Sequence, residues 1–169
     1  MTIKAEVAAE AVIHRLKQLS FTLALSESCT AGLVSSLLAR IPGASDVLWG
    51  SFVCYTKEAK LSMLELDNLK ISAYGLVSRE TVSSMAVNTL KKSGAKIAAA
   101  VTGLAGPDGD GSNVPVGTVW IATAKPDEDA AVEKKFGFKG ARNEVRLKAA
   151  ISVFETILER LADCTNPAI

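Results

Sequence analysis

Histidine is nearly absent from the sequence and cysteine is scarce, with one His and three Cys among 169 residues. Zinc sites usually combine several His and Cys ligands at short spacings, and Cys29, Cys54 and Cys164 have no such spacing, so we expect no metal. We interpret the three cysteines as buried or incidental thiols. His14 lies off the apolar stripe of an expected helix, which predicts a surface position and argues against a Ser-His-Asp triad.

A charge imbalance and a long apolar run are also missing. Nineteen basic and eighteen acidic residues leave a net charge of +1. No basic stripe with interleaved aromatic residues occurs, so nucleic acid is not an expected partner. No apolar stretch reaches the roughly 20 residues that span a bilayer, and residues 1–6 lack the basic and then apolar pattern of a signal peptide. We therefore expect a cytoplasmic protein with no membrane partner, folded as one domain over residues 1–169.

Hydrophobic periodicity predicts an alternation of helices and strands along the chain. We expect helices at 5–19, 30–40, 56–66, 78–92 and 142–161, strands at 21–25, 47–55, 96–101, 118–124 and 131–138, and a connector at 71–76. The first half favours parallel crossovers, and the last two strands favour an antiparallel pair. The pattern therefore predicts an α/β fold, a three-layer α/β/α sandwich with a mixed, mostly parallel sheet.

The most informative segment is Ser26-Glu27-Ser28-Cys29-Thr30-Ala31-Gly32, a hydroxyl-rich turn between an expected strand and an expected helix. Such a turn gathers side-chain oxygens and backbone N–H groups, which suits either an anion site or a nucleophile with an oxyanion hole. Ser28 is therefore a candidate nucleophile. Cys29 is a rival, but a cysteine nucleophile would want a histidine partner that this chain scarcely offers.

A second segment, Cys54 to Lys60, adds a phenol and two amines. Lys60 is attractive as the base for Ser28, because it follows Tyr55 by one short helical stretch at the end of a neighbouring strand. A lysine can act as a base when burial or a nearby cation lowers its pKa. The alternative is that Lys57 and Lys60 are solvated helix residues and that Tyr55 is a half-buried strand aromatic.

A glycine-rich loop, residues 102–113, follows the expected strand 96–101. Its glycines allow close approach of the backbone to a ligand, at a position where open α/β sheets bind ligands. It lacks the Gly-Lys-[Ser/Thr] end of a phosphate loop and the G-x-G-x-x-G order of a dinucleotide site, and its acidic residues do not complete a calcium loop. A plain surface loop remains the alternative. Arg142, at the start of the last expected helix, could clamp a phosphate.

Four ordered segments, SESCTAG (26–32), CYTKEAK (54–60), VTGLAGPDG (101–109) and PVGTVW (115–120), closely resemble the CinA C-terminal domain family. Over residues 5–160 the chain is similar to its stand-alone members, the nicotinamide-nucleotide amidases of PncC type, without a molybdopterin-binding-like domain before it. The resemblance implies an α/β/α sandwich that hydrolyses the carboxamide of nicotinamide mononucleotide, giving nicotinic acid mononucleotide and ammonia. It also implies a homo-oligomer and no metal or organic cofactor.

The resemblance assigns roles to particular residues. It implies Ser28 as the nucleophile, Lys60 as the base and Tyr55 in their hydrogen-bond network. The implied substrate-binding residues are Cys29, Thr30 and Gly32 around the oxyanion, and Thr102, Gly103, Gly106 and Arg142 around the ribose phosphate.

This chain departs from the family pattern at Ala31, which replaces a glycine, at Thr56-Lys57, and at Ala141, where the middle residue of the late element is usually acidic. Substrate preference is the property that these departures affect most. Two alternatives from other classes stay open: a non-catalytic nucleotide-binding or regulatory module, and a metal-dependent phosphatase.

Overall fold

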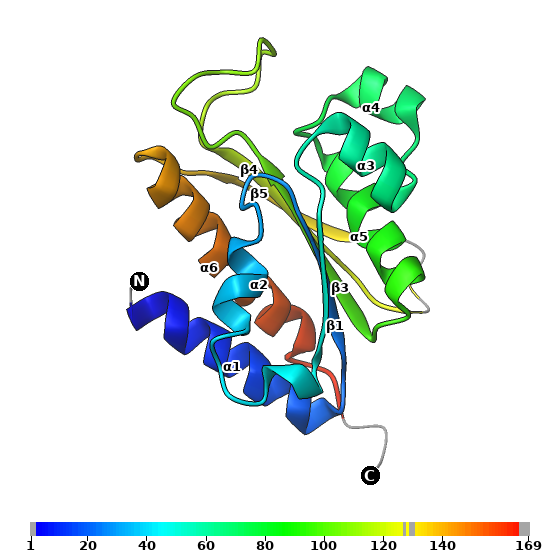
Figure 1. Ribbon diagram of the computed structural model, residues 1–169, viewed down its shortest axis with the longest axis vertical. Helices are drawn as coiled ribbons and strands as arrows, with labels where there is room; N and C mark the ends of the chain where they lie inside the picture. Colours follow the sequence, from blue (N-terminus) through cyan, green and yellow to red (C-terminus); the bar gives the residue numbers. More distant parts are fainter. Residues whose placement is uncertain (1–2, 127, 129–130, 166–169) are drawn as a thin grey trace.

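The computed structural model describes residues 3–126, 128 and 131–165. A five-stranded sheet of order β2-β1-β3-β4-β5 lies between two layers of helices (Figure 1). The strands are β1 (Leu23–Glu27), β2 (Leu48–Val53), β3 (Ile97–Gly103), β4 (Thr118–Ala124) and β5 (Val132–Gly137). The helices are α1 (Ile3–Leu19), α2 (Leu33–Leu38), the 3-10 turn η1 (Ala44–Asp46), α3 (Lys57–Leu64), α4 (Asn68–Tyr74), α5 (Arg79–Ser93) and α6 (Arg142–Leu161).

Helices α1, α2 and α6 cover one face of the sheet, and α3, α4 and α5 cover the other (Figure 1). Strand β1 pairs in parallel with both β2 and β3, whereas β4 runs antiparallel to β3 and to β5. Four of the five strands thus point in one direction. The expected three-layer α/β/α sandwich with a mixed, mostly parallel sheet is confirmed.

The central strands bury both of their faces, which explains their nearly continuous apolar sequences. Every residue of β1 is buried, and only Gly103 of β3 is partly exposed. The edge strands β2 and β5 are half-exposed. Because β1, β2 and β3 are parallel, their carboxyl ends meet at one edge of the sheet, and the segments that follow them start side by side there.

Two apolar clusters hold the layers together. The first packs α1, α2 and α6 on the sheet through residues such as Leu16, Leu25 and Phe154. The second packs α3, α4 and α5 on the opposite face through residues such as Leu64 and Met85. All five side chains are at most 1% exposed, and truncation of such a residue typically costs about 2–5 kcal/mol.

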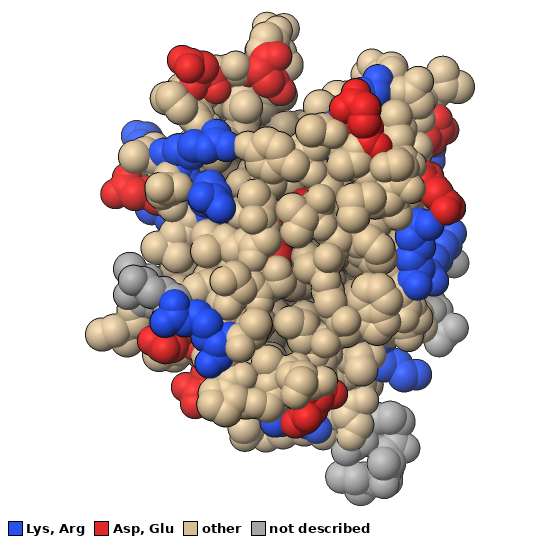
Figure 2. Space-filling model, viewed as in Figure 1, with Lys and Arg blue, Asp and Glu red and all other residues tan. Residues whose placement is uncertain are grey.

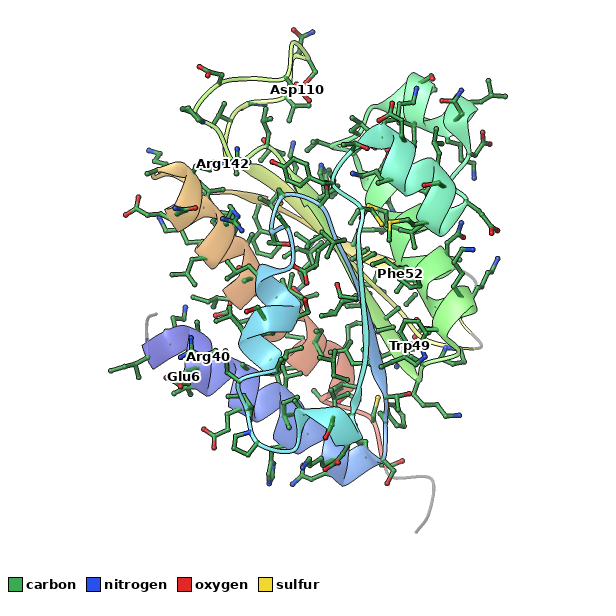
Figure 3. All side chains as sticks on the ribbon, viewed as in Figure 1. Glu6, Arg40, Trp49, Phe52, Asp110 and Arg142 are labelled. Carbon is green, nitrogen blue, oxygen red and sulfur yellow. The ribbon has the colours of Figure 1, made fainter. Side chains whose placement is uncertain are left out.

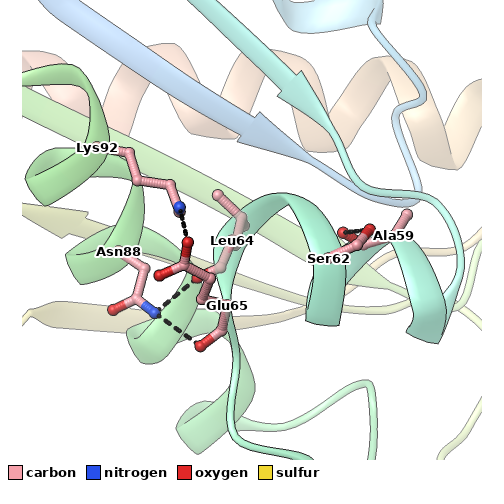
Figure 4. A network of polar contacts seen from close by, with 6 residues as sticks. All are labelled: Ala59, Ser62, Leu64, Glu65, Asn88 and Lys92. Carbon is pink, nitrogen blue, oxygen red and sulfur yellow. Dashed lines mark hydrogen bonds and ion pairs between the residues drawn. The ribbon is translucent and has the colours of Figure 1, made fainter.

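Helix α3, which carries Lys60, is fixed at both ends. Thr56 caps its start by accepting a 3.1 Å hydrogen bond from the Ala59 N–H. At its end, the Asn88 amide donates to the Leu64 carbonyl at 2.8 Å, and Lys92 pairs with Glu65 at 2.6 Å (Figure 4). Both partners belong to α5, so the position of α3 depends on a helix that packs directly on the central strands.

Several expected boundaries were wrong. Strand β1 spans 23–27 rather than 21–25, because Ser26 and Glu27 are buried in it despite their polarity. Helix α2 covers only 33–38 of the expected 30–40, since a turn with positive φ at Ala31 precedes it. Strand β2 ends at Val53, which leaves Tyr55 beyond the strand.

The expected connector at 71–76 was also wrong. Most of it belongs to helix α4, which the Asp67 carboxylate caps by accepting from the Leu69 N–H at 2.8 Å and which Gly75 ends. Conversely, Ser78 caps α5 at the start of the helix expected over 78–92, and His14 is exposed as expected. No helix within the described ranges is long and apolar enough to cross a membrane.

Candidate active site

A buried amine and a buried hydroxyl meet at the carboxyl edge of the sheet. Ser28 is the first residue after β1, and its N–H donates to the Val101 carbonyl of β3 at 3.0 Å. Lys60 reaches it from α3, with Nζ 2.8 Å from Ser28 Oγ and 2.8 Å from the Cys54 carbonyl oxygen. Only 1% of Lys60 and 7% of Ser28 are exposed. The structure therefore brings together the two residues that the sequence singled out.

The environment of Lys60 favours a neutral amine. Burial lowers the Lys60 pKa from its ordinary value of 10.5, because a charge is poorly solvated in the protein interior. Among the described residues no carboxylate forms an ion pair with it. A neutral amine can donate one N–H to the Cys54 carbonyl and direct its lone pair at the Ser28 hydroxyl. This arrangement is that of a base beside its nucleophile.

The turn after Ser28 leaves backbone donors available. Ala31 has φ 50° and Gly32 has φ 87°, so the chain passes through the left-handed region before α2 begins. Within the described structure, the N–H groups of Cys29 and Thr30 donate to no other residue. N–H groups that follow a nucleophile and pair with no other residue are candidate donors to an oxyanion.

Glu27 supports this turn from within the protein, although no role was predicted for it. Its carboxylate is fully buried and accepts from the Thr30 hydroxyl at 2.8 Å, the Val34 N–H at 3.0 Å and the Ser35 N–H at 2.9 Å. The hydroxyls of Ser35 and Ser51 donate to it as well. The carboxylate therefore satisfies the first N–H groups of α2, which stabilises both the anion and the helix start. Its place a few residues before a helical run was the one signal in the sequence.

A cavity of about 220 Å³ opens beside Ser28 and Lys60. In Figure 3 it lies near the base of the loop over 104–117, where the Arg142 label marks the start of α6. Figure 2 shows a notch between this loop and α4, with basic side chains over the start of α6. Seven of the ten predicted site residues line the cavity: Ser28, Cys29, Tyr55, Lys60, Thr102, Gly103 and Arg142.

The other three predicted residues are not among those that line the cavity. Thr30 is fully buried against Glu27, Gly32 precedes α2, and the Gly106 carbonyl accepts from Arg142 at 2.6 Å. Thr102, although it lines the cavity, uses its hydroxyl to donate to the Leu76 carbonyl at 2.9 Å. These residues shape the site through their backbones and neighbours.

Arg142 and Tyr55 form one wall of the cavity. The guanidinium donates to the Gly106 carbonyl and to the Tyr55 hydroxyl. No carboxylate of the described residues forms an ion pair with Arg142, so its charge is available to an anionic ligand. Tyr55 therefore contacts Arg142, whereas the hydrogen bonds of Lys60 go to Ser28 and Cys54.

Cys29, the rival nucleophile, lines the cavity as a neutral thiol. Burial raises its pKa to about 12, and a thiol reacts as a nucleophile through its thiolate. The thiol packs closely on Gly103: a Cβ placed there would lie 3.1 Å from Cys29 Sγ. The position therefore fits a packing role better than a reacting one.

Comparisons with known proteins show which sequences this chain resembles. The family model of the CinA C-terminal domain matches residues 5–161. The chain is 37% identical to a CinA-like protein of Thermotoga neapolitana over 91% of its own length and 41% identical to one of Prochlorococcus marinus over 81%. It spans only 37% and 32% of those two relatives.

Solved structures extend the match to the fold. A crystal structure of the competence/damage-inducible protein CihA of Agrobacterium tumefaciens is 34% identical, covers 96% of this chain and 100% of its own, and superposes with a TM-score of 0.89. A CinA superfamily protein of Klebsiella pneumoniae, 26% identical, reaches a TM-score of 0.90 over 95% of this chain and 99% of its own.

Proposed function

The chain belongs to the CinA C-terminal domain family, and from this premise we propose that it is an amidohydrolase acting on nicotinamide mononucleotide. The products would be nicotinic acid mononucleotide and ammonia. The single observation that carries the proposal is the 2.8 Å contact between Lys60 Nζ and Ser28 Oγ at the base of a cavity. A serine becomes nucleophilic when a neutral base takes its proton, and the burial of Lys60, which lowers its pKa, favours the neutral form.

The acylation step uses both residues. Ser28 Oγ attacks the carboxamide carbon while its proton passes to Lys60 Nζ, and the carbonyl oxygen becomes an oxyanion. The N–H groups of Cys29 and Thr30 are the proposed donors that stabilise it, and removal of one such donor typically lowers kcat by about 10²–10³. The C–N bond then breaks, Lys60 returns the proton to the leaving nitrogen, and ammonia departs from a Ser28 ester.

Deacylation follows the same order of steps, with water as the nucleophile in place of Ser28. Lys60 takes a proton from a water molecule as its oxygen attacks the ester carbon, and the bond to Ser28 Oγ breaks. The proton then returns to Ser28, and the carboxylate product leaves. No further reactant is needed, because one amide and one water yield one carboxylic acid and one ammonia.

Arg142 supports a phosphorylated substrate. Its guanidinium lines the same cavity as Ser28, and no carboxylate among the described residues pairs with it. A phosphate bound there would anchor the remote end of the substrate, and such binding energy orients the amide at the nucleophile. The requirement for the phosphate separates this proposal from a simple amidase.

The proposal is tested by incubating the purified chain with nicotinamide mononucleotide and EDTA and measuring ammonia and inorganic phosphate. Ammonia release without phosphate release supports the amidase. Phosphate release that EDTA abolishes would support a metal-dependent phosphatase instead. Binding of the nucleotide without either product would support the alternative of a non-catalytic nucleotide-binding or regulatory module.

A further inference from the structure

The turn that carries the proposed oxyanion donors is held from two sides by opposite charges. On one side Thr30 Oγ1 donates to the Glu27 carboxylate at 2.8 Å. On the other side the Thr30 carbonyl accepts from Arg146 at 2.8 Å. One fully buried residue thus connects an acidic and a basic side chain that form no ion pair with each other.

The turn needs such support because its backbone is strained. Ala31 has φ 50°, a left-handed conformation that is unfavourable for a non-glycine residue. Helix α2, which follows, has only six residues, and its N-cap residue, Gly32, has no side chain to cap it. An isolated helix of this length is unstable in water, so contacts outside the turn must hold it.

Glu27 provides the first set of contacts. Besides Thr30, it accepts from the N–H groups of Val34 and Ser35. The start of α2, which follows Ser28 in sequence, is therefore fixed to the end of β1, which precedes Ser28. Nothing in this set touches Ser28 Oγ or Lys60 Nζ.

Arg146 provides the second. It lies on α6 four residues after Arg142, so the two arginines are neighbours on one face of the helix. Arg142 points its guanidinium at the cavity wall, where it contacts Tyr55 and Gly106. Arg146 instead contacts Thr30 and Asn143. Burial raises the pKa of the Cys29 thiol, and the nearby charge of Arg146 opposes this effect in part.

We propose that Glu27 and Arg146 are a positioning pair that sets the oxyanion turn of the active site through Thr30. This inference rests on the proposed amidase function for its kinetic readout. Neither residue touches the reacting atoms, so the pair acts on kcat through the geometry of the Cys29 and Thr30 N–H groups. Arg142, one helical turn earlier, acts on substrate binding.

The two neighbouring arginines make a matched test. We expect Arg146→Met to lower kcat at least tenfold and to leave KM within about twofold, because an interaction made only in the transition state is lost. Arg142→Met should instead raise KM. Arg146→Lys should recover part of the lost kcat, and circular dichroism should show all variants folded.

Coupling between the pair is measured with Glu27→Gln. If both residues act on one turn, the Glu27→Gln/Arg146→Met variant loses less activity than the product of the two single losses. A loss of activity equal to the product of the two single losses would overturn the proposal that the two residues act together. An unchanged kcat in Arg146→Met, or a raised KM alone, would also overturn it.

A second readout separates this inference from the proposed substrate. A fluorophosphonate reacts as Ser28 Oγ displaces fluoride from phosphorus and its proton passes to Lys60. The rate of this labelling therefore depends on the geometry of the turn and does not require an amide substrate. Arg146→Met should slow the labelling of Ser28, followed by mass spectrometry. If the wild type is labelled but releases no ammonia from nicotinamide mononucleotide, the proposed substrate is wrong. The labelling rates alone then test the proposed role of Glu27 and Arg146. Absence of both labelling and turnover would overturn both proposals.

Discussion

Lys60 Nζ and Ser28 Oγ lie 2.8 Å apart although 32 residues separate them in the chain. The contact joins the end of β1 to a helix that follows β2, and parallel pairing of the two strands brings these segments together. The amine is buried beside a backbone carbonyl and lacks a carboxylate partner among the described residues. The proposed chemistry therefore depends on this pair and on the packing around it.

The pH dependence of activity should report the Lys60 amine. Burial lowers its pKa below 10.5, and the neutral form is the base. We therefore expect kcat/KM to rise with pH through the Lys60 pKa and to level off above it, with a midpoint below 10.5. A pH profile that falls over the same range would contradict the assignment.

The same shift predicts how stability changes with pH. At pH values between the Lys60 pKa in the folded protein and 10.5, the unfolded chain binds one more proton than the folded protein. The free energy of unfolding therefore rises with pH in this window and is lost as the pH falls toward the pKa in the folded protein. The slope approaches about 1.4 kcal/mol per pH unit. Urea unfolding at several pH values should show this slope in the wild type and lose it in Lys60→Met. An identical slope in both proteins would show that Lys60 is not responsible.

Cys29 should be dispensable for the chemistry. Burial raises its pKa to about 12, so at neutral pH almost no thiolate exists. We expect Cys29→Ala to turn over substrate within about tenfold of the wild-type rate, the loss reflecting packing against Gly103, and iodoacetamide to leave the rate unchanged. Abolished turnover in Cys29→Ala, with the fold intact, would make the thiol the nucleophile.

Tyr55 should orient the cavity wall and not transfer protons. Its hydroxyl contacts Arg142, and the base already has both of its partners. Tyr55→Phe should therefore raise KM by roughly 10- to 100-fold, because a hydrogen bond to a charged group is worth about 1.5–3 kcal/mol, with kcat nearly unchanged. Steady-state kinetics separate the two effects, and a loss of most of the turnover rate at saturating substrate would place the phenol in the proton path.

Two glycines offer a matched test of the packing beneath the site. A Cβ at Gly103 would lie 2.8 Å from the Thr118 carbonyl oxygen and 2.8 Å from Val119 Cγ2, whereas a Cβ at Gly109 meets nothing within 4 Å. We expect Gly103→Ala to destabilise the fold by about 1–3 kcal/mol and Gly109→Ala to change stability by less than about 0.5 kcal/mol. Thermal unfolding measures both, and equal effects would contradict this packing.

Periodicity was sufficient for the order of the main elements and for the mixed sheet, because β1 and β3 have the continuous apolar sequences of strands covered on both faces. It failed at α4, a seven-residue helix whose start depends on one cap, Asp67. Ser28 and Lys60 were recognisable as candidates from the segments that contain them, and the resemblance of these motifs then assigned their roles. The hydrogen bond between them could not be derived from the sequence, since it arises from the pairing of strands that are separate in the chain.

Glu27 and Arg146 show what local sequence cannot convey. A glutamate at the end of a strand is normally exposed, and here burial is tolerated because five donors surround the carboxylate. An arginine within an amphipathic helix normally faces solvent, and Arg146 differs only because α6 packs beside the turn that contains Thr30. Both roles depend on tertiary contacts.

The most direct measurement is the rate of ammonia release from nicotinamide mononucleotide by Ser28→Ala and Lys60→Met, beside the wild type and Lys57→Met. Lys57 lies on the same helix outside the cavity lining, so its variant controls for loss of a positive charge on α3. We predict wild-type rates in Lys57→Met and losses of at least about 100-fold in the other two variants. Turnover that survives in a folded Lys60→Met protein would contradict the central claim that this lysine is the base.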